Sequence, residues 1–178
     1  LSEARKQPTS DGWQLATLSC FRSINYQAVV FCSHDDLTKA ELKGGKDCVD
    51  RNKRALSSAP PGFSEHATGF ALDFTVRSIA GNRSIDCKPE KPPCEKEMST
   101  TIGKWLLKNA GCFGFELSFP GDLGDATRRT NEQGVMYEPW HWRWVGTDAS
   151  TDAAKLARGM FADARIWYPN KAPPCPAK

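Results

Sequence analysis

The sequence lacks the features that define several broad classes of protein. No apolar stretch approaches the roughly 18–20 residues that a helix needs to cross a bilayer. The chain begins with the polar stretch LSEARKQPTSDGW, which does not have the pattern of a signal peptide, so we expect any export signal or anchor to lie outside this sequence. Basic residues form no run longer than RNKR at 51–54 and the net charge is +3, so a nucleic-acid interface is not expected.

Paired CxxC motifs are also absent, which argues against a structural zinc site made of cysteines. The chain nevertheless contains 7 cysteines, a high count that favours disulfides in an oxidising compartment and hence a periplasmic or secreted protein. Cys87 and Cys94 enclose the short loop KPEKPP and are predicted to pair. Because the count is odd, one thiol stays unpaired, and Cys175 in the C-terminal tail is the candidate. The remaining connectivity is open.

A chain of 178 residues with 39% apolar and 25% charged residues is most simply one soluble domain, and we expect a monomer. Sequence patterns predict strands over 14–20, 70–74, 113–119 and about 140–145, and helices over 24–33, about 99–110 and about 151–165. Loops are predicted over 34–62 (with a short helix), 81–97 and 120–134. Strands and helices are segregated along the chain, which predicts an α+β fold with a small antiparallel sheet and flanking helices.

The predicted elements also have specific ends and faces. The predicted caps and stops are Ser23 before the first helix, Gly111 after the second, and Thr147 or Asp148 before the last. The apolar face of the first helix is predicted to contain Ile24, Ala28 and Phe31, and that of the second Ile102, Trp105 and Leu106. In the strand at 70–74, Phe70, Leu72 and Phe74 share one face, whereas Ala71 and Asp73 share the other.

Asp73 is an unexpected residue in the apolar strand of SEHATGFALDF at 64–74. Burial of a carboxylate is costly unless it is paired or bound to a metal. The chain has 3 histidines, and two of them, His66 and His141, lie in segments with candidate partner carboxylates. Two imidazoles and one carboxylate form a tetrahedral zinc set whose fourth position is open to water, which is the pattern of a catalytic site.

Glu138 lies three residues before His141 in YEPWHWRWVG at 137–146. Pro139 cannot donate a ladder hydrogen bond, so Glu138 is predicted to lie on the turn that enters the strand. There its carboxylate can meet a water on the metal, whose pKa zinc lowers towards about 7, and act as general base. Blander interpretations stay open on these grounds alone: a surface histidine at 66, a salt bridge at Asp73, and a chance ExxH spacing.

Two segments resemble the signature motifs SxHxxGxAxD and ExWHxR of the VanY-type D-alanyl-D-alanine carboxypeptidases. This zinc peptidase superfamily also includes D-Ala-D-Ala dipeptidases and L-alanoyl-D-glutamate endopeptidases. The matching segments are SAPPGFSEHATGFALDF at 58–74 and YEPWHWRWVG at 137–146. SCFRSINYQ at 19–27 resembles the family's SGYRS…Q, with Cys20 and Phe21 in place of glycine and tyrosine, and KWLLKNAGCFGFELSFP at 104–120 resembles its intervening helix and strand. The resemblance spans residues 14–146.

The resemblance implies a Zn²⁺ ion bound by His66, Asp73 and His141 in a cleft on the sheet, with Glu138 as the catalytic base. It also implies that Arg22 engages substrate, and a guanidinium is suited to hold a peptide's terminal carboxylate through two parallel hydrogen bonds.

Supporting residues are less clearly defined. Ser64 is predicted to orient substrate or a ligand, and Gln27 to contribute to the substrate-binding pocket. The three tryptophans at 140, 142 and 144 share a strand face and are expected to pack in the core.

We therefore predict one catalytic domain over 1–178, with a family-like core at 14–146 and a C-terminal helix and proline-rich tail at 147–178. Its predicted reaction removes the terminal D-alanine from peptidoglycan stem peptides that end in D-Ala-D-Ala. One alternative is an L,D- or D,D-endopeptidase of the same superfamily. Another is a non-catalytic zinc-containing binding or signalling module that keeps this fold, as the Hedgehog signalling domain resembles these peptidases without being an established one. Such a module would not need the base Glu138.

Overall fold

A computed structural model of the protein describes residues 4, 6–7, 10–33, 55, 58–81, 95–120, 135 and 137–163. The elements are β1 (Trp13–Ser19), α2 (Ile24–Ser33), the 3₁₀ helix η1 (Glu65–Thr68), β2 (Ala71–Ser78), α5 (Glu95–Met98), α6 (Thr101–Asn109), the 3₁₀ helix η2 (Ala110–Phe113), β3 (Phe115–Leu117), β4 (His141–Trp144) and α7 (Asp152–Met160). Among these residues, no helix has the length and apolarity that a membrane crossing requires.

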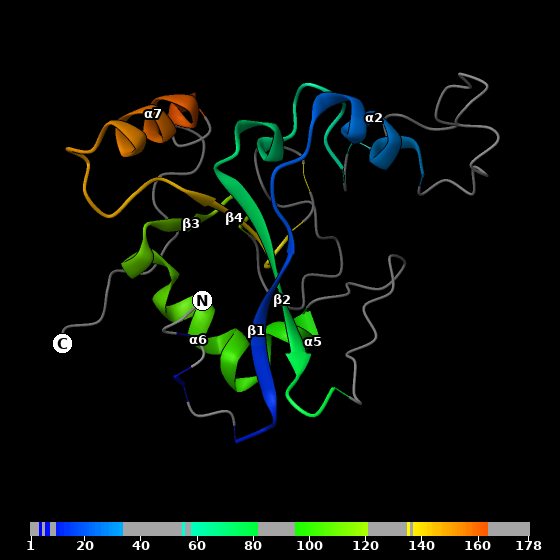
Figure 1. Cartoon of the computed structure of the whole chain (residues 1–178), viewed down its shortest axis with the longest axis vertical. Helices are drawn as coiled ribbons and strands as arrows, with labels where there is room; N and C mark the ends of the chain where they lie inside the picture. The colour runs from blue at the N-terminus through cyan, green and yellow to red at the C-terminus, as the bar shows by residue number, and fades with distance from the viewer. Residues whose placement is uncertain are drawn as a thin grey trace.

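The strands form one antiparallel sheet in the order β1-β2-β4-β3. Figure 1 shows β1 and β2 as long neighbouring strands, with α5 and α6 at one end of the sheet and α2 and α7 towards the other. The small antiparallel sheet with its flanking helices confirms the α+β prediction. The two strands that carry the histidine and aspartate motifs, β2 and β4, lie at the centre of the sheet.

The main core lies between one face of the sheet and helix α6. Alternate residues of β2, Leu72, Phe74 and Val76, contact this core, as the predicted two-residue periodicity requires. From α6, Ile102 and Leu106 are buried against them. Asp73 alternates with these residues, so its side chain projects from the opposite face, where the candidate site lies.

Helix α2 has the predicted bounds, and Ser23 Oγ accepts a hydrogen bond from the backbone N–H of Tyr26 at 3.2 Å. Its predicted apolar face is confirmed at Phe31 and wrong at Ile24 and Ala28, which are exposed; among the described side chains of the helix, at 24–31, the buried ones are Gln27 and Phe31. The Gln27 amide donates to Ser58 Oγ and to Ala59 C=O, and the apolar pattern does not indicate these contacts.

The segment after α6 also differs from the prediction. Gly111 does not end the helix but lies inside η2, which terminates at Gly114 with a φ of 78°. At Gly114 a Cβ atom would lie 2.6 Å from the backbone carbon of Gly146, so the close approach of two chain segments requires glycine here. The strand predicted over 113–119 is therefore limited to β3, and Phe113 instead packs its ring 5.9 Å from that of Trp105.

The predicted cap of the last helix is also wrong. Thr151, and not Thr147 or Asp148, caps α7 by accepting a hydrogen bond from Ala154 N–H at 3.2 Å. The Asp148 carboxylate instead accepts from Ser150 N–H in the preceding turn. In the predicted loop 81–97, residues 95–97 belong to the short helix α5. The predicted loops are otherwise mostly outside the described residues, as are His34 and the tail after residue 163.

Two cysteines have described side chains. Cys20 is an exposed free thiol, and Cys112 is disulfide-bonded. An unpaired thiol therefore exists at Cys20, whereas Cys175, the candidate for that role, lies outside the described residues. The predicted Cys87–Cys94 bond also lies outside them and stays a prediction.

Candidate metal centre

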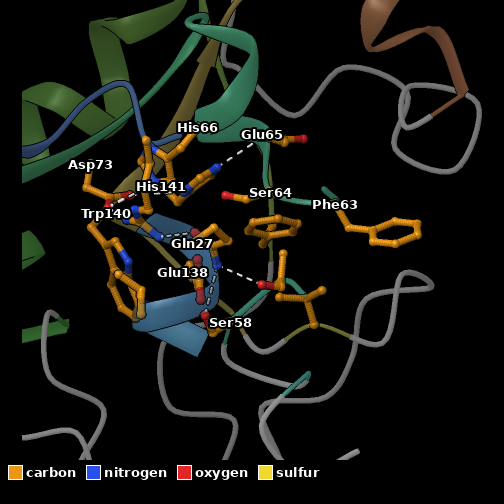
Figure 2. A pocket seen from close by; sticks show the side chains of 15 residues that line it. Gln27, Ser58, Phe63, Ser64, Glu65, His66, Asp73, Glu138, Trp140 and His141 are labelled. Carbon is orange, nitrogen blue, oxygen red and sulfur yellow. Dashed lines mark hydrogen bonds and ion pairs between the residues drawn. The ribbon is translucent and has the colours of Figure 1, made fainter. Parts of the chain in front are cut away.

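A cavity of about 200 Å³ opens on the face of the sheet opposite the α6 core. It is lined by Arg22, Gln27, Val30, Ser58, Ala59, Phe63, Ser64, Glu65, His66, Asp73, Phe119, Val135, Glu138, Trp140 and His141. Figure 2 shows these side chains, with His66, Asp73 and His141 close together and Phe63 directed away from them. Every site residue predicted from the sequence lines this one cavity.

The sheet register brings the two motifs together. Asp73 on β2 is the direct partner of His141 on β4. The backbone bonds from Phe74 N–H to Trp140 C=O (2.8 Å) and from Trp144 N–H to Phe70 C=O (2.7 Å) flank this pair. Asp73 and His141 thus form a non-hydrogen-bonded pair, the type of cross-strand position at which side chains lie closest.

His66 reaches the same point from the 3₁₀ helix η1. This helix ends at Gly69, whose φ of 77° reverses the chain into β2. The His66 Nε2 atom lies 3.2 Å from Asp73 Oδ2, and His141 Nδ1 lies 2.9 Å from Asp73 Oδ1. One donor atom from each of the three buried residues lies within 4.8 Å of the other two, close enough for all three to hold one metal ion.

The outer nitrogen of each imidazole has its own acceptor. His66 Nδ1 lies 2.7 Å from the carbonyl oxygen of Cys20, and His141 Nε2 lies 3.1 Å from Glu65 Oε2. When a metal binds the inner nitrogen of a ring, the remaining ring proton lies on the outer nitrogen, which then donates to its carbonyl or carboxylate acceptor. The inner nitrogens, Nε2 of His66 and Nδ1 of His141, both face Asp73, so a metal at this position would meet one lone pair from each ring. This donor set fits a divalent metal ion.

Without a metal, the same groups form a charged cluster. Burial disfavours a charge on His141, but its hydrogen bonds with Asp73 and Glu65 outweigh this effect and raise the pKa of His141 to about 10. Burial also disfavours ionised Asp73, but hydrogen bonds from His141 and His66 hold the pKa of Asp73 below its usual value. The metal-free site therefore keeps a proton on His141 at neutral pH.

Glu138 lies on the turn before β4, as predicted. Its backbone N–H donates to Phe119 C=O at 3.2 Å, and its own carbonyl accepts from His141 N–H at 3.1 Å. Burial raises the pKa of the Glu138 carboxyl to about 8, and the nearby charges of Asp73 and Glu65 add to this effect. A buried carboxyl with a pKa near neutrality is suited to exchange protons with a reacting group.

Arg22 lies beside the metal donors and has a fixed orientation. Its Nη1 donates to Gln27 Oε1 at 2.7 Å and its Nη2 to Ser19 Oγ at 3.0 Å, while Nη2 lies 3.9 Å from Asp73 Oδ2. Gln27 is 1% exposed and donates its amide to Ala59 C=O at 2.6 Å. Gln27 thus connects Arg22 to the 58–59 segment.

The remaining predicted residues have distinct environments. Ser64 is buried at the cavity wall, immediately before η1. Trp142 is 1% exposed in the core, in agreement with the packing prediction, and Trp144 is half-buried with its ring stacked 6.1 Å from Phe70. Trp140 instead lines the cavity. The indole of Trp140 is therefore available to contact a ligand.

Glu65 is a site residue that the sequence reasoning missed. It lies between Ser64 and His66 in the first motif, and its carboxylate contacts His141 and forms an ion pair with Arg143 at 3.1 Å. Burial opposes ionisation, but the hydrogen bond and charge of His141, with the charge of Arg143, lower the pKa of Glu65 to about 2. Its position directly before the predicted ligand His66 was the one sequence feature that could have indicated a role in the site. Its partners Ser118 and Arg143 lie more than 50 residues away in the chain, so the sequence did not reveal these contacts.

The chain is similar to several known proteins. Residues 1–147 match the VanY family, described as D-alanyl-D-alanine carboxypeptidase. The chain is 34% identical over 144 residues to a D-alanyl-D-alanine carboxypeptidase of Enterococcus faecalis, with coverage of 80% of this chain and 44% of that protein. The solved structure of the LD-carboxypeptidase LdcB is 30% identical, with a TM-score of 0.53 over 94% of this chain and 62% of that one.

A further similar structure is the D,D-pentapeptidase VanY from a VanB-type resistance cassette, solved as a mutant in complex with Zn(II). It is 22% identical, with a TM-score of 0.50, and the match covers 93% of this chain and 75% of that one; this likeness concerns the fold alone. The chain spans less than half the length of the curated relatives it matches. The family match covers most of the chain, and the chain belongs to the VanY family of D-alanyl-D-alanine carboxypeptidases.

Proposed function

We propose that this chain is the catalytic domain of a zinc carboxypeptidase that removes the terminal D-alanine from peptidoglycan stem peptides ending in D-Ala-D-Ala. The observation that carries the proposal is the convergence of a His66/Asp73/His141 donor set and a buried glutamate, Glu138, in one cavity. Family membership supports the same reaction. Because peptidoglycan lies outside the cytoplasmic membrane, the proposal includes a location in the cell envelope or outside the cell.

The metal in this proposal is zinc, held by His66, Asp73 and His141, because two imidazoles and one carboxylate are a typical catalytic zinc set. Bound zinc would supply Lewis acidity toward the scissile carbonyl and toward a water molecule. The protein's own contribution is to place the water, the substrate and a base together in one cavity.

Glu138 is the proposed base. In its ionised form it takes a proton from the attacking water as the oxygen–carbon bond forms, and passes that proton to the amine of the departing D-alanine as the peptide C–N bond breaks. The products are the shortened peptide and free D-alanine. An adjacent positive charge lowers a carboxyl pKa, so a dication in the site favours the ionised form that this role requires.

Arg22 is the proposed recognition group for the free carboxylate of the substrate. Its hydrogen bonds to Gln27 and Ser19 fix the guanidinium at the cavity wall before substrate arrives. A prepositioned guanidinium loses little further freedom when it binds a carboxylate. Recognition of the free carboxylate distinguishes a carboxypeptidase from an endopeptidase, which cuts where no such group is present.

Likeness to LdcB favours a second candidate, an L,D-carboxypeptidase, which would remove D-alanine from a stem tetrapeptide. The test is to incubate the zinc-loaded protein separately with a stem pentapeptide, a stem tetrapeptide and a cross-linked muropeptide, and to identify the products by mass spectrometry. Loss of one alanine from the pentapeptide supports the D,D reaction. Loss from the tetrapeptide supports the L,D reaction, and splitting of the cross-link supports an endopeptidase. No cleavage of any of them contradicts the proposal.

We expect Arg22→Ala to lower kcat/KM for a free-acid peptide by about ten- to a hundred-fold, since a hydrogen bond to a charged group contributes about 1.5–3 kcal/mol. Cleavage of the same peptide with an amidated C-terminus should already be slow in the wild type and change little in the variant. Steady-state kinetics on the two peptides measures both effects. Equal cleavage of the amidated and free-acid peptides by the wild type would contradict the carboxylate role and favour the endopeptidase alternative.

Zinc binding should release protons at about pH 7, because the raised pKa of His141 keeps the metal-free imidazole protonated and a metal can bind only its neutral form. At lower pH a larger fraction of His141 is protonated, and this proton competes with zinc for the ring nitrogen. Zinc affinity should therefore fall as the pH decreases and rise as the pH approaches the pKa of His141. Calorimetric titration of the metal-free protein in two buffers of different ionisation enthalpy measures the released protons. A binding enthalpy that is the same in both buffers would argue against this coupling.

A further inference from the structure

Glu65 is outside the metal donor set, yet it contacts one of the donors directly. Its Oε2 lies 3.1 Å from Nε2 of His141, while Nδ1 of the same ring lies 2.9 Å from Asp73. In Figure 2, a dashed line joins Glu65 to the His141 ring. The imidazole of His141 is therefore held between two carboxylates. Asp73 lies on the Nδ1 side, where the metal would bind, and Glu65 lies on the opposite, Nε2 side.

The Glu65 carboxylate is itself fixed by two other residues. Arg143 Nη1 donates to Oε1 at 3.1 Å, and Ser118 Oγ donates to Oε2 at 2.5 Å. Arg143 is 1% exposed and also donates through Nε to Glu116 Oε1 at 2.7 Å. With the guanidinium paired on one oxygen, the other oxygen of Glu65 accepts hydrogen bonds from Ser118 and His141.

We propose that Glu65 is a positioning residue for His141, which holds the ring as the Nε2–H tautomer and directs the Nδ1 lone pair toward the metal. A second carboxylate or carbonyl behind a metal-binding imidazole commonly sets both its tautomer and its orientation. His66 has a comparable arrangement, since its Nδ1 donates to the Cys20 carbonyl. The inference rests on the proposed zinc peptidase function. It adds Glu65 as a residue that acts on the metal through the ligand His141.

The first test uses the wild-type protein. Nitrogen-15 NMR of the zinc-loaded protein, with His141 assigned by comparison with His141→Gln, distinguishes a protonated from a metal-bound ring nitrogen. We expect the proton on Nε2 of His141 and the metal on Nδ1. A spectrum with the metal on Nε2 and the proton on Nδ1 would overturn the proposal, whatever the behaviour of any Glu65 variant.

The second test compares Glu65→Gln with Glu116→Gln. Both variants remove one carboxylate that pairs with Arg143, but of these two residues only Glu65 contacts His141. A glutamine amide has one acceptor oxygen and therefore cannot accept from Arg143, Ser118 and His141 as the carboxylate does. We expect Glu65→Gln to lower zinc affinity by about 10- to 100-fold, measured by competition with a chelator, and Glu116→Gln to stay close to the wild type.

Equal losses in the two variants, or wild-type zinc affinity in Glu65→Gln, would overturn the positioning role. If Glu65→Gln does not fold, the NMR assignment of the wild type decides. The proposed function fails separately: a wild type that binds no zinc removes both proposals. By contrast, the wild type could bind zinc and cleave stem peptides while Glu65→Gln keeps the wild-type zinc affinity. That outcome would overturn only the role of Glu65.

Discussion

Replacement of Glu138 by glutamine is expected to lower kcat for stem-peptide cleavage by about 10²- to 10⁴-fold, the range that general acid–base groups contribute. Glutamine keeps the size of the side chain but cannot accept a proton from water. Since Glu138 is not one of the three residues whose donor atoms converge, the variant should keep its zinc. The predicted combination is therefore an inactive, metal-loaded protein.

Elemental analysis and steady-state kinetics on the same preparation test this combination. Asp152→Asn is a suitable control for the loss of one negative charge, because Asp152 is exposed on α7. Should Glu138→Gln retain near wild-type turnover, Glu138 would not be the base. Should it instead lose its zinc, Glu138 would act as a metal ligand and the assigned donor set would need revision.

Replacement of Asp73 by asparagine should remove both zinc and activity. Asp73 Oδ2 faces His66 and Asp73 Oδ1 faces His141, so its carboxylate connects the other two donors. Loss of an outer partner of a metal ligand typically costs 10- to 100-fold in affinity, and loss of an anionic ligand should cost at least about 100-fold. Zinc competition with a chelator, followed by elemental analysis after gel filtration, measures the loss.

Arg77→Gln provides a control on the same strand, since Arg77 is exposed near the far end of β2. It should bind zinc as the wild type does. Circular dichroism of the metal-free Asp73→Asn protein separates loss of the site from loss of the fold. Stoichiometric zinc in a folded Asp73→Asn protein would contradict the assigned ligand set.

The parts of the fold that were predictable from sequence are those governed by local patterns. Ile102 and Leu106 are buried on α6 because one turn of an amphipathic helix separates them. Gly69 ends η1 with a left-handed φ, which glycine adopts more readily than other residues do. Strand β4 and the turn at Glu138 similarly follow from the alternating tryptophans and Pro139.

The errors arose where distant partners decide the structure. Gln27 is buried on α2 because residues 31 and 32 positions away accept hydrogen bonds from its amide, which no helical pattern can reveal. Phe113 continued an alternating strand pattern, but the contact between Gly114 and Gly146 places it in a 3₁₀ turn instead. Tertiary contacts such as these override local propensity.

The candidate site was more predictable than the elements around it. Few histidines were available, and the two motifs and their family resemblance indicated His66, Asp73, His141 and Glu138, all of which line one cavity. Their catalytic roles stay predictions. Glu65 could not be assigned from sequence, because its position depends on Arg143 and Ser118, 78 and 53 residues away.

The direct pairing of Asp73 with His141 gives the metal site a role in strand alignment. These two residues lie 68 positions apart in the chain and meet only when β2 and β4 are correctly aligned. A shift of one residue would turn one side chain to the opposite face of the sheet and separate the donors. A bound ion would therefore favour a single alignment of the two central strands. The metal ion proposed for catalysis would then also stabilise the correct register of β2 and β4.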